Sequence, residues 1–165
     1  MAVSRACGTC TLCCKVMEVG EIAKPQGAWC AHCTPGKGCA IYDARPAECR
    51  TFQCEWLLND AMGPEWKPEK SKFVLVRRRG RIVAHLDPAT PSAWRKSPYR
   101  EGLAQLVQRA LSGNELVYVA VNRHYTLLLP DREVDLGELS NEDEVALKVV
   151  RTPRGMDYQV EVHRH

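Results

Sequence analysis

Three pairs of short apolar or alternating segments lie between residues 73 and 162. The pairs cover residues 73–76 and 82–86, residues 117–121 and 125–129, and residues 145–149 and 158–162. A turn segment that contains glycine, asparagine or proline separates the two members of each pair. Apolar segments joined in this way are typical of β-hairpins. The pattern therefore predicts three antiparallel strand pairs.

One segment between the first two pairs has the spacing of an amphipathic helix. Ser97 suits its N-cap, Pro98 its first position and Gly113 the position after its end. Its apolar stripe recurs every three to four residues and consists of Tyr99, Leu103, Leu106, Val107 and Ala110. The sequence thus predicts an α+β fold in which this helix covers an antiparallel sheet.

Residues 1–62 show neither strand nor helix periodicity and contain few apolar residues, so hydrophobic burial alone cannot fold them. A helix is expected only from Pro46 through Phe52 and Trp56 towards Gly63. Residues 63–68 hold two prolines and a glycine, which predicts a boundary. We expect an irregular cysteine-rich module over 1–62 and an α+β part over 63–165, packed as one unit.

The composition is that of an ordinary globular protein, with 45% hydrophobic and 26% charged residues. No apolar run approaches the roughly 20 residues of a membrane-spanning helix. The first residues lack the apolar core of a signal peptide. These features predict a cytoplasmic protein without a membrane partner, in a compartment that keeps thiols reduced.

Charge is unevenly distributed along the chain, although the net charge is only +3. Residues 67–109 hold eleven Lys/Arg and three Asp/Glu, and residues 131–144 hold seven acids and Arg132. Two interpretations are open. The two blocks are solvated faces that meet in the fold, or the basic block binds an anionic partner such as nucleic acid. The candidate contacts of such a partner are Arg77, Arg78, Arg79 and Arg81.

All nine cysteines lie within residues 7–54, and three pairs of them have two residues in between. Cysteines that serve only as buried apolar residues would be scattered through residues 73–162, where there are none. Thiolates are soft ligands that zinc and iron–sulfur clusters favour. Their clustering predicts a metal site, whose binding free energy would fold the module. The candidate ligands are Cys7, Cys10, Cys13, Cys14, Cys30, Cys33, Cys39, Cys49 and Cys54.

The sequence leaves the metal open between zinc and iron, including an iron–sulfur cluster. The spacing of Cys7, Cys10 and Cys13 is like the opening of a ferredoxin run, but Cys14 follows directly and no Cys-Pro occurs. Two zinc sites of four thiolates each would leave one cysteine over. Four thiolates around a divalent ion carry a charge of about −2. The basic residues nearest in sequence are Arg5, Lys15, Lys37, Arg45 and Arg50.

Two further features belong together with the first cysteine run, namely Trp29-Cys30 and the segment CAIYDARPAECRTF at residues 39–52. The combination resembles the CxxCxxCC proteins, a family described as zinc- or iron-chelating and labelled as iron–sulfur oxidoreductases. The resemblance covers about residues 5–58, and Cys33 lies outside the family pattern. It implies that Tyr42, Arg45 and Pro46 pack around and support the ligands. The ligands that it implies are Cys7, Cys10, Cys13, Cys14, Cys30, Cys39 and Cys49, with Cys54 as a further one.

Three functions are compatible with these features. The first is a cytosolic protein that chelates zinc or iron and presents the metal to a protein partner. The second is an iron–sulfur or iron-dependent oxidoreductase, and the third is a nucleic-acid or protein adaptor with a structural zinc module. No nucleophile elbow, phosphate loop or dinucleotide fingerprint occurs, so the sequence indicates no catalytic residue.

Overall fold

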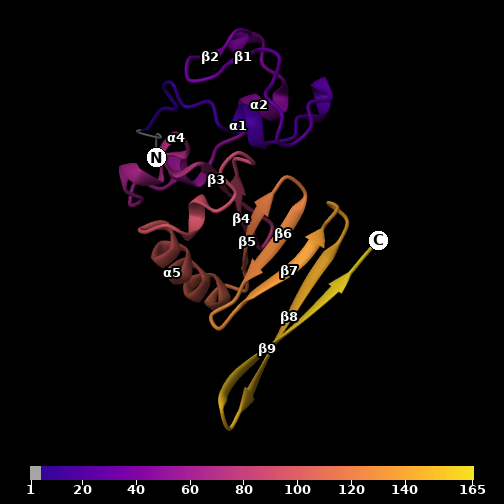
Figure 1. The fold of residues 1–165 in the computed structure, drawn as a ribbon. Helices are drawn as coiled ribbons and strands as arrows, with labels where there is room; N and C mark the ends of the chain where they lie inside the picture. The colour runs from indigo at the N-terminus through magenta and orange to yellow at the C-terminus, as the bar shows by residue number, and fades with distance from the viewer. Residues whose placement is uncertain (1–4) are drawn as a thin grey trace.

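A five-stranded sheet lies at the centre of the structure, a computed structural model that describes residues 5–165 (Figure 1). Neighbouring strands follow the order β3-β4-β5-β6-β7. All neighbours are antiparallel except β4 and β5, which are parallel. The predicted α+β class with a largely antiparallel sheet is confirmed. The strands are β3 Phe73–Arg78, β4 Arg81–Leu86, β5 Leu116–Val121, β6 His124–Leu128 and β7 Glu133–Glu138.

Helix α5, Tyr99–Ser112, provides the crossover that the parallel pair requires. Its residues Leu103, Val107 and Ala110 are buried against one face of the sheet, so the predicted helix and its apolar stripe are confirmed. The N-cap differs from the prediction. Pro98 occupies that position without a side-chain cap, and the Ser97 hydroxyl instead donates a hydrogen bond to the Glu101 carboxylate over 3.0 Å.

The third strand pair, β8 Glu144–Thr152 and β9 Gly155–His163, forms a separate two-stranded sheet. Its apolar side packs against the face of the main sheet opposite α5, around Tyr118 and Leu127. The main sheet is therefore a middle layer between α5 and this hairpin, and the far end of the hairpin projects beyond it (Figure 1).

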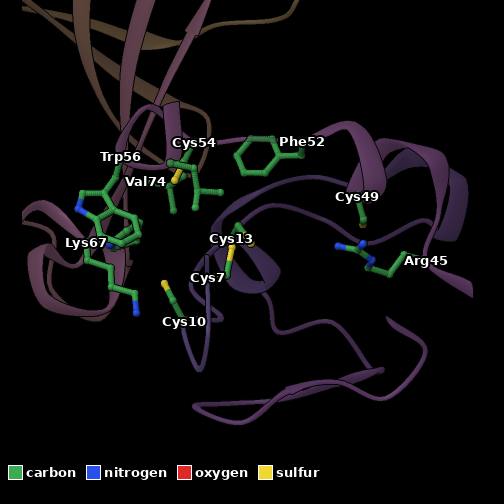
Figure 2. A pocket seen from close by; sticks show the side chains of 12 residues that line it. Cys7, Cys10, Cys13, Arg45, Cys49, Phe52, Cys54, Trp56, Lys67 and Val74 are labelled. Carbon is green, nitrogen blue, oxygen red and sulfur yellow. The ribbon is translucent and has the colours of Figure 1, made fainter. Parts of the chain in front are cut away.

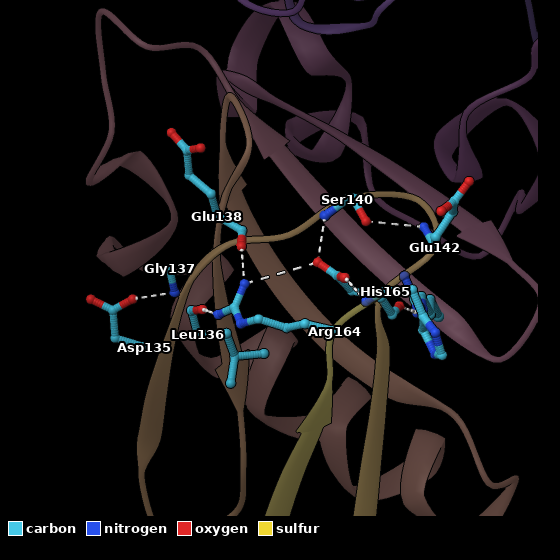
Figure 3. Close-up of polar contacts among 10 residues, drawn as sticks. Asp135, Leu136, Gly137, Glu138, Ser140, Glu142, Arg164 and His165 are labelled. Carbon is cyan, nitrogen blue, oxygen red and sulfur yellow. Dashed lines mark hydrogen bonds and ion pairs between the residues drawn. The ribbon is translucent and has the colours of Figure 1, made fainter.

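A polar network ties the base of this hairpin to β7 (Figure 3). Arg164 donates to the carbonyl oxygens of Glu138 and Leu136 over 2.7 and 3.0 Å. The Asp143 carboxylate accepts from the backbone N–H of Ser140 and of His165. These bonds hold the pKa of Asp143 below its usual value. The hairpin is thus fastened to β7 at its base.

The acidic block contains a strand that the sequence pattern did not predict. Val134 and Leu136 of β7 alternate with Glu133 and Asp135, so the block is part of the sheet. It also meets the basic block, since Arg95 donates two hydrogen bonds to the Glu133 carboxylate, each 2.7 Å long. This contact is the meeting of two oppositely charged faces that one interpretation expected.

The N-terminal module consists of short elements joined by turns. The predicted helix from Pro46 is wrong in its extent, because Phe52 adopts an extended conformation and splits it into two. Phe52 and Cys54 both contribute to the core around Val74 and Val76, which a continuous helix through this segment would not allow. The elements are α1 Cys13–Val16, η1 Gly20–Ile22, β1 Cys33–Thr34, β2 Gly38–Cys39, η2 Tyr42–Ala44, α2 Ala47–Thr51 and α3 Glu55–Leu58.

The predicted boundary at residues 63–68 is folded. It contains η3 Pro64–Trp66 and leads into α4 Pro68–Ser71. The Trp66 ring lies edge-on to Phe73 and to Tyr99, with centroid separations of 5.9 and 5.3 Å. The segment therefore joins the module to the helix-covered face of the sheet. Ala93–Arg95 forms η4, and none of the helices in the described part of the chain has the length and apolar character of a membrane span.

Candidate metal centre

All nine predicted ligands are free thiols in the N-terminal module. Cys54 is buried, Cys7 is exposed and the other seven are intermediate. None of the nine forms a disulfide, so every sulfur atom is available as a donor. The module that carries them lies at one end of the molecule (Figure 1).

Five cysteines line one cavity of about 80 Å³, and we call them the cavity group (Figure 2). A tight turn, in which the Cys10 N–H donates to the Cys7 carbonyl over 3.0 Å, folds the first run back on itself. Gly8 has a φ of +57° in this turn, a conformation that favours glycine. The turn brings the first three cysteines of the chain to the same cavity as Cys49 of α2 and Cys54, the N-cap of α3. The cavity group comprises Cys7, Cys10, Cys13, Cys49 and Cys54.

The remaining four cysteines, Cys14, Cys30, Cys33 and Cys39, lie around the loop of residues 30–39, and we call them the loop group. Cys33 and Cys39 are directly opposite each other in the β1–β2 pair. The Cys30 N–H donates to the Cys14 carbonyl over 3.0 Å and fastens the loop to α1. The Cys14 thiol is hydrogen-bonded to both Cys13 and Cys33. The adjacent Cys13 and Cys14 therefore connect the cavity group with the loop group.

The thiols make one another harder to ionise. The hydrogen bond with Cys13, followed by burial, raises the pKa of Cys14. Burial and then the charge of Cys14 raise the pKa of Cys33 to about 12. Burial and then Cys54 raise the pKa of Cys7. A cation among these sulfur atoms would reverse the effect by stabilising their thiolate forms.

The donor chemistry fits a soft metal, because the clustered groups are sulfur atoms that are not engaged in disulfides. Among the His, Cys, Asp and Glu side chains of residues 5–165, no group of three or more has the arrangement of a metal site. Free thiols are ligands of the kind that zinc and iron take. Binding of zinc or iron by the nine cysteines therefore stays a prediction.

Basic residues also border the cysteines. Arg45, as expected, lines the cavity, and its guanidinium stacks on the Tyr42 ring at 3.7 Å from the centroid. Tyr42 itself is 60% exposed, so its packing role is limited to this contact. Figure 2 shows Arg45 beside Cys49 and Lys67 on the opposite side of the cavity. Lys67, which the sequence did not single out, also pairs with Glu69 over 2.9 Å.

Arg5 and Lys15, two other expected neighbours of the cluster, have other partners. Arg5 donates to backbone carbonyls within and after α3, including those of Trp56 and Met62. Lys15 pairs with Asp87. These two cations therefore stabilise the module's fold.

The arginines of the first hairpin, candidates for nucleic-acid contact, largely have partners within the chain. Arg77 forms an ion pair with Glu115 over 3.5 Å, and Arg78 lies over the Phe52 ring. Arg81 donates to the backbone carbonyl of Asp143. Three of the four candidate side chains thus contribute to the fold, and nucleic-acid binding stays a prediction.

The likeness of residues 5–58 to the CxxCxxCC proteins stays a prediction as well. What the site can bind is inferred from its thiols, its cavity and its neighbouring cations. The chain matches no model of a protein family, no curated protein and no solved structure.

Proposed function

We propose that this protein binds zinc or iron through its cysteine cluster. The observation that carries the proposal is the gathering of all nine cysteines as free thiols in one module, five of them around one cavity. Free thiols persist in a reducing compartment, which supports a cytoplasmic location. The resemblance to the zinc- and iron-chelating CxxCxxCC proteins supports the same function.

The module has little other means of stabilisation. Its buried apolar residues Leu12, Val16 and Cys54 pack against Val74 and Val76 of β3, and most of residues 20–50 lie outside this core. Metal held by the cavity group and the loop group would connect these irregular segments. Binding free energy would then appear directly as folding free energy.

A bound zinc ion would supply structure and Lewis acidity, whereas iron or an iron–sulfur cluster would also supply electron transfer. The chain's own residues would hold and orient the metal through their sulfur atoms. Arg45 and Lys67 would place positive charge at the cavity, which offsets the negative charge of the thiolates.

An iron-dependent oxidoreductase is the second candidate, and the cavity is the observation that favours it. A purely structural thiolate site is closed by its ligands. Here a space of about 80 Å³ borders five cysteines and is also lined by Phe52 and Trp56. A metal bound here by fewer than all five of these cysteines would keep a position open towards Phe52 and Trp56.

Metal analysis of untagged protein, purified without oxygen, tests the proposal. We expect at least one equivalent of zinc or iron, and most of the nine thiols protected from a thiol reagent until a chelator is added. A colourless zinc protein supports the chelating function, and a brown protein that dithionite bleaches supports the oxidoreductase.

A cysteine variant and a matched control complete the test. Cys10→Ser with Cys13→Ser should lower the metal content by at least half. His124→Ala with His163→Ala, which removes two exposed imidazoles from β6 and β9, should leave it unchanged. Substoichiometric zinc and iron together with freely titrating thiols would show that the proposal is wrong.

A further inference from the structure

Lys24 is a buried ammonium group in the middle of the cysteine module. The residue is only 5% exposed. Its Nζ donates to the backbone carbonyls of Lys15 over 2.7 Å and of Pro25 over 2.9 Å, and also to that of Met17. A lysine ammonium has three donors. All three are therefore satisfied by neutral acceptors.

The position of Lys24 links its charge to the cysteines. The carbonyls of Lys15 and Met17 lie at the end of α1, the helix that carries Cys13 and Cys14. A backbone bridge between Val19 and Lys24 folds the intervening segment back towards this helix end. The ammonium is thus fixed at the junction of the cavity group and the loop group.

Lys24 lacks the partner that a buried cation ordinarily has. Lys15, from the same module, pairs with Asp87 over 2.6 Å, and Lys67 pairs with Glu69 over 2.9 Å. Within residues 5–165, no carboxylate lies within ion-pair distance of Lys24. A buried charge without a counter-charge is costly. The nearest groups that can become negative are the thiols.

The influences on the pKa of Lys24 agree with this geometry. Burial lowers the pKa of Lys24, and the thiolate charges of Cys30, Cys14, Cys13 and Cys49 act in the opposite direction. Those four cysteines come from both groups. Four thiolates around a divalent ion leave a net charge of about −2, which a fixed ammonium offsets.

We infer that Lys24 is the built-in counter-charge of the metal-loaded cysteine cluster. It is a positioning residue that stabilises the loaded module relative to the metal-free one. This inference rests on the proposed metal-binding function. The Lys24 ammonium is held by neutral carbonyls alone, whereas the thiolates of a loaded cluster would supply a negative charge beside it.

Two substitutions separate the charge of Lys24 from its hydrogen bonds. Lys24→Gln removes the charge and keeps N–H donors for the carbonyls, and Lys24→Met removes both. Cobalt(II) titration, with zinc competition, measures the affinity of each protein through its thiolate-to-metal absorption. We expect both variants to bind about tenfold to a hundredfold more weakly than the wild type. Wild-type affinity in Lys24→Gln, with loss only in Lys24→Met, would assign the effect to the hydrogen bonds and overturn the inference.

Two lysines of the same module serve as controls. Lys15→Met breaks the ion pair with Asp87 and lowers stability, and Lys37→Met removes an exposed charge in the 30–39 loop. The loss of metal affinity expected for the Lys24 variants should be absent in Lys37→Met and smaller in Lys15→Met. Equal losses in Lys15→Met and Lys24→Gln would show that module stability alone sets the affinity, against the inference.

Titration remains informative for variants whose metal-free module is unfolded, because folding and metal binding are measured together. A wild-type protein that binds neither cobalt nor zinc would count against the proposed function. Tight binding by the wild type and equally tight binding by both Lys24 variants would overturn this inference alone.

Discussion

Lys15 Nζ lies 2.6 Å from Asp87 Oδ1, and this ion pair joins helix α1 of the cysteine module to the end of β4. The two side chains are only 16% and 15% exposed. The same carboxylate oxygen accepts the Ala89 N–H over 2.9 Å. One carboxylate therefore fixes both the loop that leaves the sheet and the helix that carries two candidate ligands.

Asp87→Asn should destabilise the protein by about 1–3 kcal/mol, because it leaves the partly buried Lys15 ammonium without its counter-charge. Denaturant unfolding measures the loss. Adding Lys15→Met to Asp87→Asn should cost less than the sum of the two single changes, since both remove the same interaction. Asp131→Asn, which breaks the exposed pair with Arg132, is the control and should have no measurable effect. Strict additivity of the two changes would contradict a coupled pair.

Removal of the metal should unfold the module and leave the sheet intact. Hydrogen exchange read by mass spectrometry, before and after anaerobic chelation, should show faster exchange throughout residues 7–54. Residues 73–86 and 116–138 should keep their protection, because the sheet has its own cores on both faces. Equal acceleration in both regions would indicate a single cooperative unit, and no change in residues 7–54 would contradict folding by metal.

Gly102→Ala should destabilise the protein, although alanine is the better helix former by about 1 kcal/mol. A Cβ at this position of α5 would lie 2.3 Å from Cζ2 of Trp66. That ring is held between Phe73 and Tyr99 and cannot move away freely. We expect a net loss of about 1–3 kcal/mol in thermal or denaturant unfolding. Gln108→Ala, on the exposed side of α5, is the control and should not destabilise the protein. A Gly102→Ala protein more stable than the wild type would show that the Trp66 ring moves to make room for the methyl group.

The sequence contained enough information for most of the sheet but not for its order. Turn residues such as Arg79-Gly80 and Asn122-Arg123 are local signals, and both predicted hairpins form at them. The parallel pairing of β4 with β5 depends on where α5 packs, which no local pattern encodes. Strand β7 was not predicted, because Glu133 and Asp135 made its segment look like a solvated acidic block. The alternation of these acids with Val134 and Leu136 also fits a strand.

His85 should make the protein less stable as the pH falls from about 6.5 to about 4. It is buried on β4, and burial, followed by the charge of Arg78, lowers its pKa to about 4. Over this range the unfolded chain binds a proton that the folded chain excludes, so stability is lost as the pH falls. The contribution is roughly 3 kcal/mol. His85→Leu should show a correspondingly smaller loss between the two pH values, and an unchanged pH dependence would show that His85 accepts the proton in the folded protein.

The cysteines of the candidate site can be named from the sequence, whereas their surroundings cannot. Cysteines carry their chemistry in their spacing, so Cys7, Cys10 and Cys13 are candidate ligands on sequence alone, and their binding of a metal stays a prediction. Lys24 has no such signal. Its burial depends on the backbone bridge with Val19 and on carbonyls at the end of α1, which only the folded chain brings together. Pro46 and Phe52 were read as parts of one helix, because the split at Phe52 arises from its contact with the core near Val74.

The cysteine module packs on β3, and the amount of folded protein in solution would depend on this contact. β3 is an edge strand, and its Val74 and Val76 are covered by residues of the cysteine module. A copy without metal, once its module unfolds, would expose these valines beside an unprotected sheet edge, the feature through which chains aggregate. On the proposed metal-binding function, supply of the metal would then govern how much of the protein stays in solution.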